Sequence, residues 1–137
     1  MSKGILIIGG AGFVGTRLAT RFSRGAQEYF LGDIDTSDRV DNIVELDVEV
    51  STSLDQVAGV ESIINLAAVH RDDVRPLSRY DDVNVQGAKN VCDAACKHGV
   101  NRIIFTSSVA IYGFAPADTD ESGEPNYFND YGRTKYL

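Results

Sequence analysis

The residues best suited to chemistry are a glycine cluster near the start of the chain and a serine–tyrosine–lysine set near its end. Gly9, Gly12 and Gly15 follow a short apolar run, and Gly10 adds an overlapping Gly-x-Gly-x-x-Gly pattern. Glycine permits a tight turn and a close approach of the backbone to a ligand, and a helix that begins there points its amide groups at negative charge. The pattern is typical of a loop that binds the pyrophosphate of a dinucleotide. A turn with a purely structural role is the alternative.

An acidic residue at the end of the second predicted strand supports the dinucleotide interpretation. Asp33 lies eighteen positions after Gly15, and a nucleotide-binding βαβ unit has an acid roughly 20 residues on, where it accepts hydrogen bonds from the adenosine ribose. A carboxylate there would repel the extra phosphate of NADP, and no arginine follows until Arg39, so the sequence predicts NAD. Asp35 is a second candidate for the ribose, although the strand end favours Asp33.

The serine–tyrosine–lysine set follows the fifth predicted strand. Tyr131 and Lys135 are four residues apart, so on a helix they share a face. An ammonium group beside a tyrosine favours the phenolate, which can act as a general acid and base. A tyrosine and a lysine at this spacing are commonly just residues of a helix surface. The glycine loop upstream favours a functional role for them here. Ser107 and Ser108 lie just after the fifth predicted strand, where serine hydroxyls can also simply satisfy backbone groups.

Alternating apolar runs and helical patterns supply the elements that position these residues. Strands are predicted at residues 4–8, 28–32, 42–46, 61–66 and 102–106, and helices at 13–22, 52–58 and 80–98, with a further helix near Asn129. Strands that alternate with helices imply right-handed βαβ units and a mostly parallel sheet. Gly99 is placed to end the long helix. Cys92 and Cys96 are predicted to be buried small residues on that helix rather than metal ligands.

Composition excludes several classes of protein. A length of 137 residues suits one domain. The net charge of −7 argues against a protein that binds the nucleic-acid backbone. No apolar run approaches the roughly 20 residues of a membrane span, and the first apolar run is too short for a signal peptide, so we expect a cytoplasmic protein. Because the sequence stops inside a predicted helix, we expect it to be part of a longer chain.

Taken in order, these motifs resemble those of the extended short-chain dehydrogenase/reductase family, in particular its sugar-nucleotide epimerase/dehydratase branch. The resemblance runs from Gly4 to the last residue and includes Asp47-Val48 after the third predicted strand and Asn65-Leu-Ala-Ala68 after the fourth. It implies an α/β fold with a Rossmann-type doubly wound parallel sheet of strand order 3-2-1-4-5, truncated before the C-terminal substrate lobe. Residues 1–137 would then form the NAD-binding domain.

The resemblance also implies roles for individual residues. Tyr131 would be the general acid and base, and Lys135 would favour its phenolate and hold the nicotinamide ribose. Ser108, with Ser107 as a neighbouring candidate, would orient the hydroxyl or carbonyl of the substrate. Asp47 and Val48 would contact the adenine. The residues expected to bind the cofactor are Gly9, Gly12, Phe13, Val14, Gly15, Asp33, Ile34, Asp47, Val48, Leu66, Ala67, Ala68, Thr106, Ser107, Tyr131 and Lys135.

Two further residues match positions near the site in relatives, and for both the role stays open. Asn84 matches an asparagine that the family keeps near the site, where a structural role is equally compatible. His70 falls where several relatives place a residue near the phosphates or the substrate, but it also suits an exposed loop. No metal ligands are expected. The resemblance further implies a homodimer formed through the long helix and the helix that carries Tyr131.

The segment after the fifth predicted strand bears on the reaction. Relatives that are 4,6-dehydratases carry an Asp-Glu pair there, whereas this chain has Ser107-Ser108-Val109-Ala110. The motifs Ser-Ser-x-x-x-Tyr-Gly and Tyr-Gly-x-x-Lys look most like those of UDP-sugar 4-epimerases. They imply an NAD-dependent epimerisation of a nucleotide sugar, at C4 of a UDP-hexose, through a transient keto sugar.

Three alternatives remain: a reductase or dehydrogenase of the same family, a dehydratase or decarboxylase, and a non-catalytic dinucleotide-binding protein. We expect the 137 residues alone to turn over no substrate, since the family's substrate lobe lies beyond them.

Overall fold

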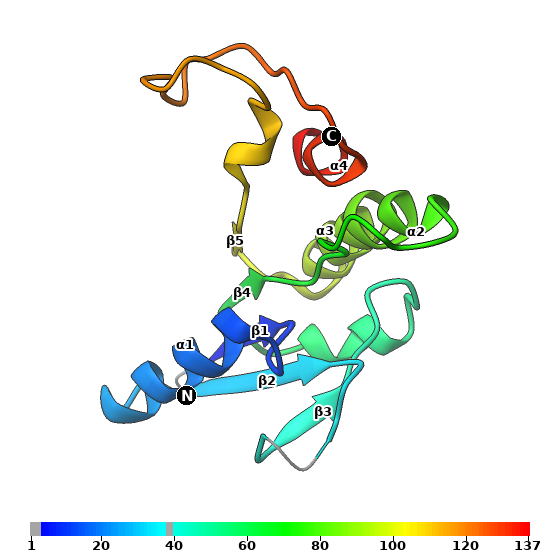
Figure 1. Ribbon diagram of the computed structural model, residues 1–137. Helices are drawn as coiled ribbons and strands as arrows, with labels where there is room; N and C mark the ends of the chain where they lie inside the picture. Colours follow the sequence, from blue (N-terminus) through cyan, green and yellow to red (C-terminus); the bar gives the residue numbers. More distant parts are fainter. Residues whose placement is uncertain (1–3, 38–39) are drawn as a thin grey trace.

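Five parallel strands form a single sheet in the computed structural model, which describes residues 4–37 and 40–137. Their order across the sheet is β3-β2-β1-β4-β5 (Figure 1). This confirms the predicted Rossmann-type order, and each predicted strand boundary lies within one residue of the observed one. The strands are β1 (Ile5–Ile8), β2 (Tyr29–Asp33), β3 (Ile43–Glu45), β4 (Ser62–Asn65) and β5 (Arg102–Phe105).

The central strand β1 is buried on both faces. Leu6 and Ile8 pack into the larger apolar cluster, together with residues of the 3₁₀ helix η1 (Ser53–Val57) and of α3 (Gly87–His98). Ile7 points to the other face and packs against Ala19 of α1 (Phe13–Arg24). Successive side chains of a strand point to opposite faces, so a continuous apolar run requires a helical layer on each side of the sheet.

The long helix predicted after the fourth strand is present but irregular. It begins with α2 (Ser78–Tyr80), continues as the π-helical segment η2 (Asp81–Gln86) and ends as α3. Gly99 ends it in the left-handed conformation, with φ of +67°, as predicted. π-Helical turns are rare and occur frequently at functional sites. Here the turn lies directly beside the last helix, α4 (Asp130–Tyr136).

After β5 the chain forms the short 3₁₀ helix η3 (Val109–Ile111) and then a long loop before α4. Figure 1 shows this loop running away from the sheet and the chain then returning to place α4 beside the helical segment. Asn129 caps α4, because its Oδ1 accepts a hydrogen bond from the amide of Gly132 at 2.7 Å. None of the helices within residues 4–37 and 40–137 combines the length and apolar character needed to cross a membrane.

The prediction for the two cysteines is wrong. Cys92 and Cys96 are both exposed, because the buried face of α3 consists of Gly87, Val91, Ala94 and Ala95. Each cysteine follows one of these buried residues directly, and a step of one residue turns a side chain about 100° around a helix of 3.6 residues per turn. The two cysteines therefore face outward from the core.

We expect Gly15→Ala to destabilise the fold. A Cβ at this position would lie 2.4 Å from the carbonyl oxygen of Gly9, so the turn after β1 or the start of α1 must move. The free energy of unfolding, measured by urea denaturation without ligand, should fall by roughly 2 kcal/mol or more.

The matched control is Gly25→Ala at the other end of α1. Its Cβ would meet no heavy atom closer than 3.5 Å and its φ is −88°, so we expect a change within about 0.5 kcal/mol. Equal effects of the two substitutions would contradict the close packing of Gly15.

Candidate functional site

A cleft of about 510 Å³ opens at the carboxyl ends of the strands. Its walls come from the glycine loop, the start of α1, the segments after each of the five strands, and the helical segments α2, η2 and α4. All sixteen residues expected to bind the cofactor line this cleft: Gly9, Gly12, Phe13, Val14, Gly15, Asp33, Ile34, Asp47, Val48, Leu66, Ala67, Ala68, Thr106, Ser107, Tyr131 and Lys135. Parallel strands bring these separate segments to the same edge of the sheet.

The glycine loop brings the start of α1 to this cleft. Gly9 has φ of +84°, which favours glycine, and a Cβ there would lie 3.0 Å from the backbone of Leu66. The amide of Gly9 donates to the carbonyl of Gly32 at 2.9 Å, which ties the turn to β2. The first turn of α1 contains no acidic side chain, and Phe13 and Val14 line the cleft. The positive end of the α1 dipole therefore faces the cleft.

The carboxylate of Asp33 organises the end of β2. One oxygen accepts a hydrogen bond from the amide of Ala11 at 2.9 Å, and the other accepts one from the amide of Asp35 at 3.0 Å. Asp33 thus holds the glycine loop in place and also lines the cleft. The carboxylate of Asp35 accepts from the amide of Ser37 instead, and Asp35 is not a lining residue. The geometry therefore favours Asp33 over Asp35 for contact with a ligand.

Lys135 and Tyr131 of α4 form the opposite end of the cleft. Lys135 is 7% exposed, and its Nζ donates to the carbonyl oxygen of Thr106 at 2.9 Å. The same nitrogen lies 6.0 Å from the centroid of the Tyr131 ring. Burial lowers the pKa of Lys135, because removal from water disfavours the charged form. The buried ammonium of Lys135 and the phenol of Tyr131 therefore lie close together in the cleft at the carboxyl ends of the strands.

Asn84 holds the segment after β4 to α4 and is 5% exposed. Its Oδ1 accepts from the amide of Val69 at 2.7 Å, and its Nδ2 donates to the carbonyl of Val69 and to Oγ1 of Thr134, both at 2.9 Å. Asn84 does not line the cleft. The structure therefore gives this residue, whose role the sequence left open, a structural position between two walls of the site.

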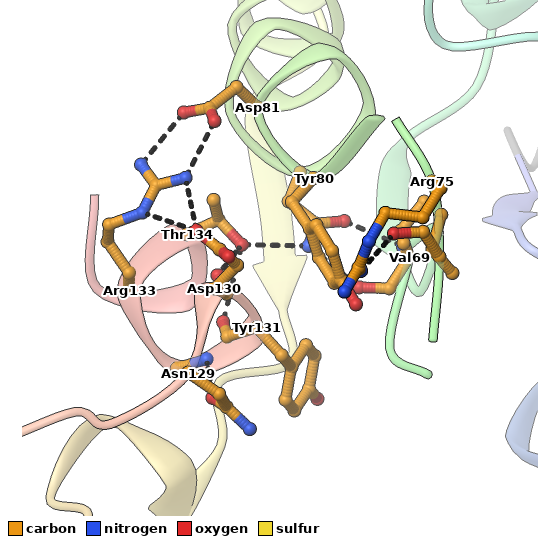
Figure 2. Close-up of polar contacts among 12 residues, drawn as sticks. Val69, Arg75, Tyr80, Asp81, Asn129, Asp130, Tyr131, Arg133 and Thr134 are labelled. Carbon is orange, nitrogen blue, oxygen red and sulfur yellow. Dashed lines mark hydrogen bonds and ion pairs between the residues drawn. The ribbon is translucent and has the colours of Figure 1, made fainter. Parts of the chain in front are cut away.

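A bidentate ion pair is a second contact between α4 and η2. The guanidinium of Arg133 donates to both carboxylate oxygens of Asp81, at 2.9 and 2.6 Å, as Figure 2 shows. The pair raises the pKa of Arg133 and lowers the pKa of Asp81. Figure 2 also shows Arg133 and Tyr131 leaving α4 on different sides. A helix of seven residues is marginal alone, so these contacts fix the direction in which Tyr131 points.

Ser108 differs from the other predicted site residues because it does not line the cleft. Its hydroxyl oxygen accepts a hydrogen bond from the amide of Ala110 at 3.1 Å and caps η3. Ser107, the neighbouring candidate, does line the cleft, and so does His70. The structure therefore brings Ser107 and not Ser108 to the cleft wall.

Sequence reasoning missed two charged residues of the cleft, Glu49 and Arg79. Glu49 directly follows Asp47-Val48, so its place in the sequence could have identified it as a residue of the cleft. Arg79 lies in α2, thirty residues further on, and only the tertiary structure brings it to Glu49. The apolar lining residues that were also missed are Ile8, Leu46, Val69 and Val83.

Comparisons with known proteins agree with this geometry. The family model described as "NAD dependent epimerase/dehydratase family" matches residues 5–137. The chain is 44% identical over 140 residues to N-acetyl-alpha-D-glucosaminyl-diphospho-ditrans,octacis-undecaprenol 4-epimerase of Escherichia coli O157:H7, a match that covers 99% of this chain and 41% of that protein.

Two solved structures are also similar. UDP-glucose 4-epimerase from Brucella ovis in complex with NAD has a TM-score of 0.88 and 27% identity, covering 98% of this chain and 45% of that one. Uronate dehydrogenase from Agrobacterium tumefaciens has a TM-score of 0.82 and 26% identity, covering 99% and 52%. The chain thus spans about half the length, or less, of these relatives.

We expect Asn84→Ala to lower the free energy of unfolding by about 2 to 3 kcal/mol, because it leaves both backbone groups of Val69 without their partner. Asn101→Ala, at an exposed loop position, is the control and should change it by about 0.5 kcal/mol at most. Urea denaturation of the ligand-free protein measures both. A similar small loss for the two variants would contradict the role assigned to Asn84.

We expect Lys135→Met to raise the thermal midpoint of the ligand-free protein by a few degrees, because it removes the cost of burying a charge. The direction of this change in thermal midpoint can be checked through its pH dependence. A lowered pKa in the folded state means that the cost is complete at neutral pH, shrinks once the pH rises through that pKa, and vanishes above the ordinary value of 10.5. Calorimetric scans from neutral to alkaline pH should therefore show the two midpoints converging. A lower midpoint for the variant at neutral pH would contradict this expectation.

Proposed function

We propose that this chain, which belongs to the NAD dependent epimerase/dehydratase family, is the NAD-binding part of an enzyme that inverts C4 of a diphosphate-linked hexose. One observation carries the proposal. The glycine loop, Asp33 and the Asp47-Val48 turn line the same cleft as Tyr131 and Lys135. A dinucleotide bound along the glycine loop, Asp33 and the Asp47-Val48 turn would place its nicotinamide beside Tyr131 and Lys135.

The residues of the cleft fit NAD. A Cβ at Gly15 would lie 2.4 Å from the carbonyl oxygen of Gly9, and one at Gly9 would lie 3.0 Å from the backbone of Leu66, so the loop is built for glycine and brings the start of α1 to the cleft. That place suits a pyrophosphate. Asp33 suits the adenosine ribose, and Asp47 and Val48 suit the adenine. The carboxylates of Asp33 and Asp47 make this end of the cleft acidic even though Glu49 is paired with Arg79, and this disfavours the additional phosphate of NADP.

Tyr131 and Lys135 supply the acid–base chemistry. NAD, when bound, provides the acceptor for a hydride from the sugar carbon and the donor for its return. Tyr131 takes the proton from the C4 hydroxyl and gives it back, so that a 4-keto sugar forms and is reduced on its other face. The ammonium of Lys135 stabilises the phenolate form of Tyr131, which is present before the proton is taken and again after it is returned. Ser107, which lines the cleft, and Ser108, which caps η3, are the candidates for orienting the sugar oxygen.

The carrier of the sugar has two candidates. The first is a nucleoside diphosphate, as the sequence motifs imply and as in the name of the Brucella ovis relative, UDP-glucose 4-epimerase. The second is undecaprenyl diphosphate, because the relative that is 44% identical is named as a 4-epimerase of an N-acetylglucosaminyl diphospho-undecaprenol. Both carriers attach the hexose through a diphosphate, so the same chemistry at C4 serves either one. A dehydrogenase remains the alternative reaction, because uronate dehydrogenase has a similar fold.

Several finer expectations stay predictions. The intact protein is expected to be a homodimer formed through α3 and α4, and to reside in the cytoplasm. Residues 1–137 are expected to act as its NAD-binding domain, with Asp33, Ile34 and Phe13 among the contacts of the cofactor.

The reaction is tested by incubating the intact protein with UDP-hexoses, UDP-N-acetylhexosamines and the polyprenyl diphosphate-linked N-acetylhexosamine, with no NAD added. An epimerase needs no net oxidant, so we expect interconversion of the two C4 epimers of one of these, detected by NMR. The position of the equilibrium should be the same from either epimer. A strict requirement for external NADPH would instead indicate a reductase and would contradict the proposal.

We expect Tyr131→Phe to lower kcat at least a hundredfold and to leave NAD binding within about threefold, because only the proton-transferring hydroxyl is lost. Tyr136→Phe on the same helix is the control, because that side chain is exposed and does not line the cleft. A Tyr131→Phe protein with unchanged turnover would reject the catalytic role, and one with no turnover and no bound NAD would point to a role in binding.

A further inference from the structure

Glu49 and Arg79 form a two-bonded ion pair in the wall of the cleft. Nη1 of Arg79 donates to Oε1 of Glu49 at 2.6 Å, and Nη2 donates to Oε2 at 2.8 Å. The fork of a guanidinium matches the two oxygens of a carboxylate, which a lysine cannot reproduce. Glu49 belongs to the segment after β3, whereas Arg79 belongs to α2. The pair therefore connects the sheet edge to the helical segment across the wall of the cleft.

The segment that this pair holds is the turn of Asp47 to Glu49. The amide of Glu49 donates to Oδ1 of Asp47 at 2.9 Å, so the position of Glu49 fixes the orientation of the Asp47 carboxylate. The amide of Asp47 donates to Oγ of Ser53 at 2.9 Å, which holds the turn from η1. Displacement of Glu49 would therefore move Asp47 with it.

Val48, the middle residue of the turn, is held by α3, which continues the helical segment that begins with α2. Nδ2 of Asn90 donates to the carbonyl of Val48 at 2.9 Å. A Cβ at Gly87 would lie 2.6 Å from Cγ2 of Val48, so the helix approaches this side chain as closely as glycine permits. Contacts from α2 and α3 thus converge on two consecutive residues, Val48 and Glu49.

Charge explains why arginine occupies this position. The pKa of Arg79 is raised, first by its hydrogen bonds to Glu49 and then by the charges of Glu49, Asp82 and Asp47. Glu49 and Asp47 are separated by one residue and both line the cleft. Like charges this close repel each other, and the guanidinium offsets that repulsion. Loss of Arg79 would therefore loosen the turn.

We propose that the Glu49–Arg79 ion pair is a positioning device that fixes the Asp47-Val48 turn as the adenine wall of the cofactor cleft. The pair sets affinity for the adenine half of the dinucleotide and takes no part in proton or hydride transfer, because the Tyr131–Lys135 end of the cleft is built from other elements. This inference rests on the proposed function, since it requires NAD in the cleft.

The test uses the intact protein, freed of nucleotide, with Arg79→Lys and Glu49→Gln as two separate variants. Each removes the two-bonded geometry from one side and keeps the size of the side chain, so a folding defect in one leaves the other to decide. Lys97→Gln is the matched control, because Lys97 forms an ion pair with Asp55 that also joins two elements but does not line the cleft. Calorimetry measures binding of NAD, AMP and nicotinamide mononucleotide, and kcat is measured at saturating NAD.

We expect both cleft variants to bind NAD and AMP roughly fivefold more weakly, the effect of losing about 1 kcal/mol from a partly exposed pair. Binding of nicotinamide mononucleotide, kcat and all values for Lys97→Gln should change by less than about twofold. The split between the two halves of the dinucleotide separates a positioning role from a general effect on the fold.

Unchanged binding of AMP in both variants would overturn the inference. Equal weakening of AMP and nicotinamide mononucleotide would also overturn it, since it would show a general loss of structure. If the unsubstituted protein binds no NAD, the proposed function fails, which is a different result from NAD binding that ignores the substitutions.

Discussion

Leu6 and Ile8 of β1 pack on one face of the sheet and Ile7 packs on the other, and the remaining architecture depends on this double burial. A strand that is apolar on both faces needs a layer of helices on each side. Helices that cross from one strand to the next make the sheet parallel, and parallel strands end at the same edge. The cleft at that edge is thus a consequence of how the core is packed.

The far side of the cleft depends on polar contacts instead of apolar ones. The helix α4 spans only seven residues and carries both Tyr131 and Lys135. Its place is set by Asn84, buried between Val69 and Thr134, and by the pair of Arg133 with Asp81. Directional hydrogen bonds specify orientation in a way that apolar packing of a short helix does not. The π-helical segment η2 provides both Asn84 and Asp81, so its irregular backbone and the orientation of the reactive side chains are linked.

Many parts of the fold and of the site could be predicted from particular residues. The run Ile5–Ile8 gave a buried central strand, the glycines gave the turn after it, and Gly99 gave the end of α3, because each of these depends on local conformation or on a simple periodicity. The exposed Cys92 and Cys96 were mispredicted, since a helical pattern locates an apolar face only to within about one residue. Ser108 was placed at the site by resemblance, yet its hydroxyl caps η3 and Ser107 lines the cleft.

The sequence by itself determined the parallel sheet, its strand order by way of the family resemblance, and the segments that reach the cleft. It could do so because strands, turns and motifs are encoded in residues close together along the chain. Only the tertiary structure decided that Arg79 meets Glu49, that Asn84 lies between Val69 and Thr134, and that Lys135 is buried against the carbonyl of Thr106. These contacts join residues 15 to 50 positions apart, and their geometry is set by how whole elements pack, which no local pattern records.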